Sequence, residues 1–255
     1  MNKMIKYILA DILKNKIVIA YTVVLFILSM SIFTFEDSAT KGVLSLLNML
    51  LFIVPLVSVI FSTIYLYNSS EFIELLVSQP LKRQSIWMSV FFGLASALCL
   101  ACLIGVGIPV LLYAAFAPGF ILLGCSLILS IIFVAIALWA GVRIRDKAKG
   151  IGLAIMLWLY FALLFDALVL FMLFQFADYP IEKGMVAVSL MNPIDISRIL
   201  ILLQVDISAM MGYTGAIFRN FFGTGMGIAI TAAILALWAI IPTWFSVRHF
   251  KTKDL

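Results

Sequence analysis

Six long apolar runs dominate the sequence, and shorter segments rich in polar and charged residues separate them. A helix needs about 20 apolar residues to cross the hydrocarbon core of a membrane, and each run is close to that length or longer. The runs lie at residues 17–35, 43–67, 86–116, 120–141, 151–176 and 221–245. This pattern predicts an all-α polytopic membrane protein, with six transmembrane helices in a single domain.

Residues 1–16 have a different pattern. Their apolar and charged residues fall on different sides of a helix, with Ile5, Ile8, Leu9, Ile12 and Leu13 at helical spacing and Lys3, Lys6, Asp11 and Lys14 elsewhere. The pattern predicts an amphipathic helix in the membrane interface, with its apolar face against acyl chains. The alternative is a plain extension of the first span.

Composition and charge support the membrane and orient the spans. Hydrophobic residues make up 65% of the chain and charged residues 11%, which is less than half of the roughly 25% charged content of soluble proteins. Of the 17 Lys and Arg residues, only Lys41, Lys183, Arg198 and Arg219 lie on the side of the spans opposite to the termini. The positive-inside rule therefore places both termini in the cytoplasm. The basic residues do not gather into one face of the kind that binds the phosphates of nucleic acid. We therefore expect the lipid bilayer as a partner and no nucleic acid.

The segment 178–220 is the one sizeable region expected outside the membrane. Asn192 has the features of an N-cap, Pro193 follows at the first helical position, and Asp195 lies in the first turn, so a helix is predicted over 194–204. A seventh span is disfavoured because Asp195 and Arg198 would lie in lipid. We expect an interfacial helix on the outer surface, where Asp195 and Arg198 form an exposed pair that a partner or substrate recognises. The alternative is a solvated polar face.

Asp166 lies inside the fifth apolar run, about 22 Å along the helix from residue 151. An ionisable group there costs roughly 2.5–3.5 kcal/mol on insertion scales, which favours a functional role. The alternatives are a structural hydrogen bond to a neighbouring helix and a span that ends early.

Residues 68–85, on the cytoplasmic side, predict a short helix between two spans. Ser70 is the expected cap, Glu71 lies in the first turn, and Pro80 ends the helix. Phe72, Leu75 and Leu76 are expected along one side, where they would dock on a soluble partner. A loop helix without a partner is the alternative.

The chemistry available to the chain is limited. No G-x-x-x-x-G-K-[ST] phosphate loop is present, so the chain is not expected to hydrolyse ATP, and the single His249 excludes a zinc protease or a serine–histidine hydrolase. Cys99 and Cys102 form a C-x-x-C on the third run that in principle suits Cu(I). We favour the interpretation that these thiols are small hydrophobic core residues, with no metal held by the chain.

Three motifs give the chain a family resemblance. They are Glu71-x-x-Glu74-Leu75-Leu76-x-x-x-Pro80-x-x-Arg83, the run of Trp158, Phe161, Phe165 and Asp166, and Met191-Asn192-Pro193-x-Asp195-Ile196-x-Arg198. With the six spans, they resemble exporter-type (type 2) ABC transporter permeases, and more narrowly the permease subunit of the nitrous oxide reductase copper-site maturation system. The chain departs from the wider family at Ile73, where a glycine is frequent, and at Met88 and Ser89, where a basic residue is frequent.

The resemblance implies a set of partners and sites. It implies a separate cytoplasmic ABC ATPase that binds ATP and Mg, a second copy of the chain, a periplasmic copper-site assembly protein, and a location in the bacterial inner membrane. Coupling to the ATPase would fall on Glu71, Phe72, Glu74, Leu75, Leu76, Pro80 and Arg83. Docking of the periplasmic protein would fall on Asn192, Pro193, Asp195 and Arg198. The alternatives are a generic permease for lipid or drug export and, less favoured, an intramembrane enzyme built around Asp166.

Overall fold

The computed structural model describes residues 2–175, 182–205 and 225–252, and these residues form helices with no strand among them. Six helices are long and apolar enough to cross a membrane, at Lys16–Phe35, Ala39–Asn68, Arg83–Tyr113, Ala117–Gly141, Lys147–Met172 and Gly227–Thr252. The predicted all-α polytopic fold is therefore confirmed.

The first four spans form most of the packed core. They comprise α2 (Lys16–Phe35), α3 (Ala39–Asn68), the third span and α7 (Ala117–Gly141). The α7 helix is the most buried span, and α3 packs along it so closely that a Cβ at Gly141 would lie 2.6 Å from Leu66 Cδ2. Small residues at such contacts let helix backbones approach, which drives helix association in membranes. Because both helices are spans and pack along each other, the α3–α7 pair connects the two ends of the bundle.

The N-terminal helix α1 (Asn2–Leu13) is separate from the first span. The chain breaks after it, and Asn15 caps α2 by accepting a hydrogen bond from the Ile17 N–H at 2.9 Å. Ile8 and Ile12 are fully buried against α5 (Arg83–Cys102), where a Cβ at Gly93 would overlap the Ile8 side chain. The helix is amphipathic as predicted, but its buried face covers α5 and not acyl chains. The difference arises because α5 has a glycine, Gly93, where it meets Ile8, so the two helices can pack closely.

Two spans contain a π-helical turn that sequence reasoning missed. The third span runs through α5, η1 (Leu103–Gly107) and α6 (Ile108–Tyr113), and the fifth through α8 (Lys147–Leu159), η2 (Tyr160–Leu164) and α9 (Phe165–Gln175). In the third span Pro109 follows the turn, and a proline removes one backbone donor and displaces the carbonyl four residues before it. Such turns frequently mark functional positions in helices.

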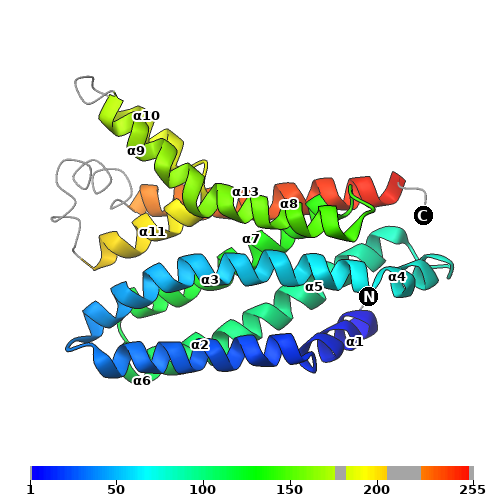
Figure 1. Ribbon diagram of the computed structural model, residues 1–255, viewed down its shortest axis with the longest axis horizontal. Helices are drawn as coiled ribbons and strands as arrows, with labels where there is room; N and C mark the ends of the chain where they lie inside the picture. The colour runs from blue at the N-terminus through cyan, green and yellow to red at the C-terminus, as the bar shows by residue number, and fades with distance from the viewer. Residues whose placement is uncertain (1, 176–181, 206–224, 253–255) are drawn as a thin grey trace.

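Figure 1 shows the start of α1, the end of the last helix and the short helix α4 (Ser70–Val77) at one end of the bundle, which we call the terminal end. The opposite end, called the far end, carries the turn between α2 and α3 and one end of α11 (Pro193–Gln204). There α9 and α10 (Glu182–Ser189) diverge from the rest of the bundle (Figure 1). The last span is α13 (Gly225–Thr252), which returns the chain to the terminal end.

Candidate functional site

At the terminal end, α4 is held between α3 and α5 by its buried side. Ile73 and Leu76 face the bundle, whereas Leu75 is 66% exposed and Phe72 is partly exposed beside Tyr7, with ring centroids 6.0 Å apart. The helix therefore has an apolar side that anchors it and a second apolar surface that no described residue covers fully. An exposed apolar surface of this kind on a short helix is typical of a docking element.

Two details predicted for this helix were wrong, namely its cap residue and the side on which Leu76 lies. Ser69, not Ser70, is the cap residue and makes no side-chain capping bond, while the Ser70 hydroxyl donates to the Tyr67 carbonyl at 2.9 Å. Leu76 does not share a side with Phe72 and Leu75, because it is turned into the bundle together with Ile73. Glu71, Glu74 and Pro80 are exposed, as a surface element requires.

Contacts between distant segments tie the terminal end together. Arg83, the first residue of α5, donates from Nη1 to the carbonyl of Lys251 near the end of α13, at 3.3 Å. Lys147 donates from Nζ to Asn68 Oδ1 at 2.8 Å and links the start of α8 to the end of α3. The helices that flank α4 are therefore connected to the fifth and sixth spans at this end.

At the other site, the junction between α10 and α11 (residues 190–192) enters the bundle at Asn192, whereas Met191 is exposed. Asn192 is fully buried and donates from Nδ2 to the carbonyl of Phe161 at 2.8 Å, inside the π turn η2. Trp238 on α13 donates from Nε1 to the Leu190 carbonyl at 3.4 Å. Phe161 is just past the middle of the span Lys147–Met172, so α11 starts at mid-span and runs toward the far end.

The start of α11 confirms the local sequence signal. Asn192 Oδ1 accepts a hydrogen bond from the Ile194 N–H at 3.0 Å, and Pro193 occupies the first helical position. Proline needs no donor there, and the Asn side chain satisfies a backbone N–H that the helix leaves unpaired. The Asn192 side chain thus caps α11 and also forms a hydrogen bond to the fifth span.

The expectation of an exposed outer helix was wrong for this part of α11. Asp195 is only 7% exposed, and Ile194, Ile196 and Ser197 are buried against α7, α3 and α13. Two charges in lipid would be costly, which favours a helix outside the membrane, but the bundle interior supplies partners for both charges. Its role in docking a periplasmic protein stays a prediction.

Arg198 lies between two carboxylates from different elements. Its Nη1 is 2.7 Å from Asp166 Oδ2 on α9 and 3.3 Å from Asp195 Oδ1 one turn earlier on α11. The structure thus brings together three of the predicted residues and shows the partner of Asp166, which sequence reasoning could not name.

The cysteines lie in the core of the bundle. Cys102 is fully buried, and Cys99 Sγ lies 3.7 Å from the Leu127 carbonyl on α7. Within the described residues, no three His, Cys, Asp or Glu side chains gather in a way that could hold a metal ion.

Two curated proteins are similar to the chain over nearly its whole length. Both are named "Probable ABC transporter permease protein NosY", and one is from Pseudomonas aeruginosa and the other from Stutzerimonas stutzeri. The first is 28% identical over 92% of this chain and 90% of its own length, and the second 27% identical over 94% and 91%. No family model matches the chain. The similarity supports a NosY-like ABC transporter permease, in agreement with the resemblance in the sequence.

Proposed function

We propose that the chain is the membrane subunit that couples ATP hydrolysis by a separate cytoplasmic ABC ATPase to work at the outer face, in the maturation of the copper sites of nitrous oxide reductase. The observation that carries the proposal is the geometry of α4. Its buried Ile73 and Leu76 hold it between two spans, and its exposed Leu75 and Phe72 are available to a partner. The relatives, which are named as ABC transporter permeases, support an ATPase partner. The maturation role follows from the resemblance in the sequence alone.

The proposed orientation puts the terminal end in the cytoplasm of a bacterial inner membrane. The basic residues Arg143, Arg145, Lys147 and Lys149 follow α7 at this end, and Lys251 lies near the end of α13. Basic residues next to spans favour the cytoplasmic side. In this orientation α4 faces the ATPase and the far end faces the periplasm.

The packing offers a mechanical connection between the two ends. The α4 helix joins α3 to α5, and α3 packs along α7. The start of α11 packs on both α7 and α3, and Asn192 and Arg198 bond the fifth span from there. We propose that a displacement of α4 by the ATPase reaches α11 through α3 and α7, because close-packed helices move as bodies.

A second copy of the chain fits the distribution of burial. Only 17% of the last span and 28% of the first are buried, against 67% of α7. These spans keep broad apolar faces for lipid or for another subunit. We propose a homodimer because ABC ATPases work as pairs in the family that the sequence resembles.

Purification of the tagged chain from its native host tests this function. We expect an ABC ATPase and a periplasmic copper-site assembly protein to co-elute, and the complex to hydrolyse ATP with Mg. An ATPase without the periplasmic protein would favour a generic exporter permease, and the absence of any ATPase would reject the proposal. A purification from cells that carry the untagged chain serves as the control.

A further inference from the structure

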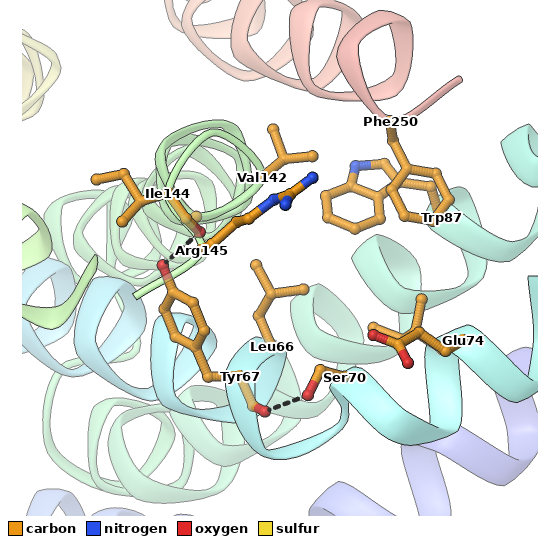
Figure 2. Close-up of a pocket in the computed structure, with 11 residues that line it drawn as sticks. Leu66, Tyr67, Ser70, Glu74, Trp87, Val142, Ile144, Arg145 and Phe250 are labelled. Atoms are coloured by element: carbon orange, nitrogen blue, oxygen red, sulfur yellow. Dashed lines mark hydrogen bonds between the residues drawn. The ribbon is translucent and has the colours of Figure 1, made fainter. Parts of the chain in front are cut away.

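A cavity of about 360 Å³ lies at the terminal end, beneath α4. Its lining comes from the end of α3, α4, the start of α5, the end of α7 with the segment that follows, and the end of α13. Figure 2 shows the residues around it. The volume is at the small end of the roughly 300–1,000 Å³ typical of ligand sites, which suits a lipid headgroup and is too small for a whole lipid.

One wall of the cavity is apolar and aromatic. Trp87 and Phe250 stack with ring centroids 4.3 Å apart, and the Trp87 indole N–H is already donated to Ser246 Oγ at 2.7 Å. Leu66 and Ile73 continue this wall. It can therefore pack against hydrocarbon but offers little to a fully hydrated ligand.

The polar groups of the cavity are of two kinds. Arg145 and Glu74 extend from different walls, with the guanidinium and the carboxylate well separated in Figure 2. The Tyr67 hydroxyl donates to the Ile144 carbonyl at 3.1 Å, and the Ser70 hydroxyl donates to the Tyr67 carbonyl at 2.9 Å. Because both hydroxyl protons are used, these two oxygens are left as hydrogen-bond acceptors.

This arrangement selects a ligand with charges of both signs. The Arg145 guanidinium has a planar set of N–H donors that suits a phosphate. The Glu74 carboxylate and the Tyr67 and Ser70 oxygens are acceptors, and a primary ammonium supplies three donors. A purely anionic headgroup would meet the Glu74 charge without compensation, and a quaternary choline has no N–H to donate.

The position of the cavity indicates the source of such a ligand. It lies where α3 and α7 end and α5 begins, which is the level of the lipid headgroups if these helices cross the membrane. Basic pockets between transmembrane helices on the cytoplasmic side bind the phosphates of anionic lipid headgroups, and here Glu74 adds an acidic group to such a pocket. We propose that this cavity binds the headgroup of a phosphatidylethanolamine from the adjacent leaflet, with its phosphate at Arg145 and its ammonium at Glu74, Tyr67 and Ser70.

The occupied cavity would also steady α4. The ligand would contact α4 through Ser70 and Glu74, and the segment after α7 through Arg145. It would bridge the proposed docking helix to the segment that follows the fourth span. Binding of the headgroup requires only that the chain spans a membrane. The lipid proposal therefore does not depend on an ATPase partner.

Native mass spectrometry of the delipidated protein tests the proposal. The protein in mild detergent is titrated with phosphatidylethanolamine, phosphatidylglycerol or phosphatidylcholine of identical acyl chains, and the retained adducts are counted. We expect phosphatidylethanolamine to be retained about tenfold more tightly than the other two lipids, the size of change expected from one charged hydrogen bond. Equal retention of the three lipids, or preference for phosphatidylglycerol, would overturn the proposal.

Variants assign the binding to the cavity. Arg145→Gln should lower retention of phosphatidylethanolamine several-fold, and Glu74→Gln should shift the preference toward phosphatidylglycerol because the repulsive charge is gone. Matched controls are Arg143→Gln, whose guanidinium lies over the Trp139 ring at 4.6 Å, and Glu71→Gln, which does not line the cavity. If the control variants lose the lipid as much as the cavity variants do, binding is not at this site. All variants should elute as the wild type does.

Discussion

Arg198 is paired with two carboxylates, so the cluster at the start of α11 carries one negative charge if all three groups are ionised. Such a charge is costly away from water unless it is neutralised. The Asp166–Arg198 pair, with Nη1 and Oδ2 2.7 Å apart, is balanced by itself. The structure thus identifies Arg198 as the charged partner of Asp166. A role of Asp166 in activity stays a proposal.

Asp166→Leu should destabilise the protein more than Asp166→Asn does. Leucine leaves Arg198 with only Asp195, whereas asparagine keeps a hydrogen-bond acceptor in nearly the same volume, so the two should differ by about 1–3 kcal/mol. Thermal unfolding in detergent measures the difference. Asp37→Asn is the control because Asp37 makes only an exposed 3.9 Å pair with Lys41. Equal stability of the two Asp166 variants would show that the ion pair contributes nothing.

At the scale of single residues, the sequence predicted what is local. Asn192 as a cap follows from its neighbours Pro193 and Asp195, and Asp166 stands out because it lies inside an apolar run. The partner of Asp166 could not be predicted, because Arg198 is 32 residues away on another element. The same holds for the Phe161 carbonyl that accepts from Asn192.

At the scale of elements, the α10–α11 junction is a helix start fixed to a π turn in a neighbouring span. The turn η2 contains no proline, and one of its carbonyls, that of Phe161, accepts from Asn192. A side chain inserted into the helix ladder is a known cause of such irregularities. The bond therefore links the geometry of the fifth span to the position of α11.

Asn192→Ala should cost more than Asn192→Ser. Alanine loses both the cap, at about 1 kcal/mol, and the bond to the Phe161 carbonyl, at about 1–3 kcal/mol. Serine keeps an oxygen that can cap but has no amide donor that reaches Phe161. Chemical unfolding of the two variants separates these contributions. If both variants are as stable as the wild type, the junction is not held by this side chain.

Leu75→Glu should uncouple the ATPase without disturbing the fold. The side chain is exposed, so a charge there costs the free protein little, but it would meet an apolar site on the partner. We expect normal insertion and strongly reduced ATPase stimulation, measured on the purified complex. Leu13→Glu, an exposed leucine at the same end on α1, is the control and should keep stimulation. Full stimulation in Leu75→Glu would exclude this surface from the coupling.

The spans themselves were predictable because hydropathy and length are enough to define them. The rotation of α4 was not, because its residues Phe72, Ile73, Leu75 and Leu76 are all apolar and the surrounding bundle decides which of them are buried. The π turns depend on packing and on single backbone bonds, which leave no periodic signal. The depth of α11 was missed for the related reason that its charges find partners only in the folded bundle.

At the scale of the whole molecule, the two proposed working surfaces lie at opposite ends. Accessibility of introduced thiols to a membrane-impermeant reagent tests this orientation. A cysteine at Asp37, which lies in the α2–α3 turn at the far end, should be labelled from outside the cell, and one at Lys251 only after lysis. The native Cys102 and Cys125 are buried and Cys99 is mostly covered, so they give a low background. External labelling at Lys251 would contradict the six-span orientation.

The central claim is that an ATPase at α4 moves the α10–α11 region through the bundle. The most direct measurement is the distance between spin labels at Asp37 and Met191, both exposed, in the purified complex with its ATPase. We predict that the distance distribution differs between the nucleotide-free complex and the complex trapped with ATP, Mg and vanadate, and that Leu75→Glu abolishes the difference. An identical distribution in both states, in a complex that hydrolyses ATP, would contradict the account.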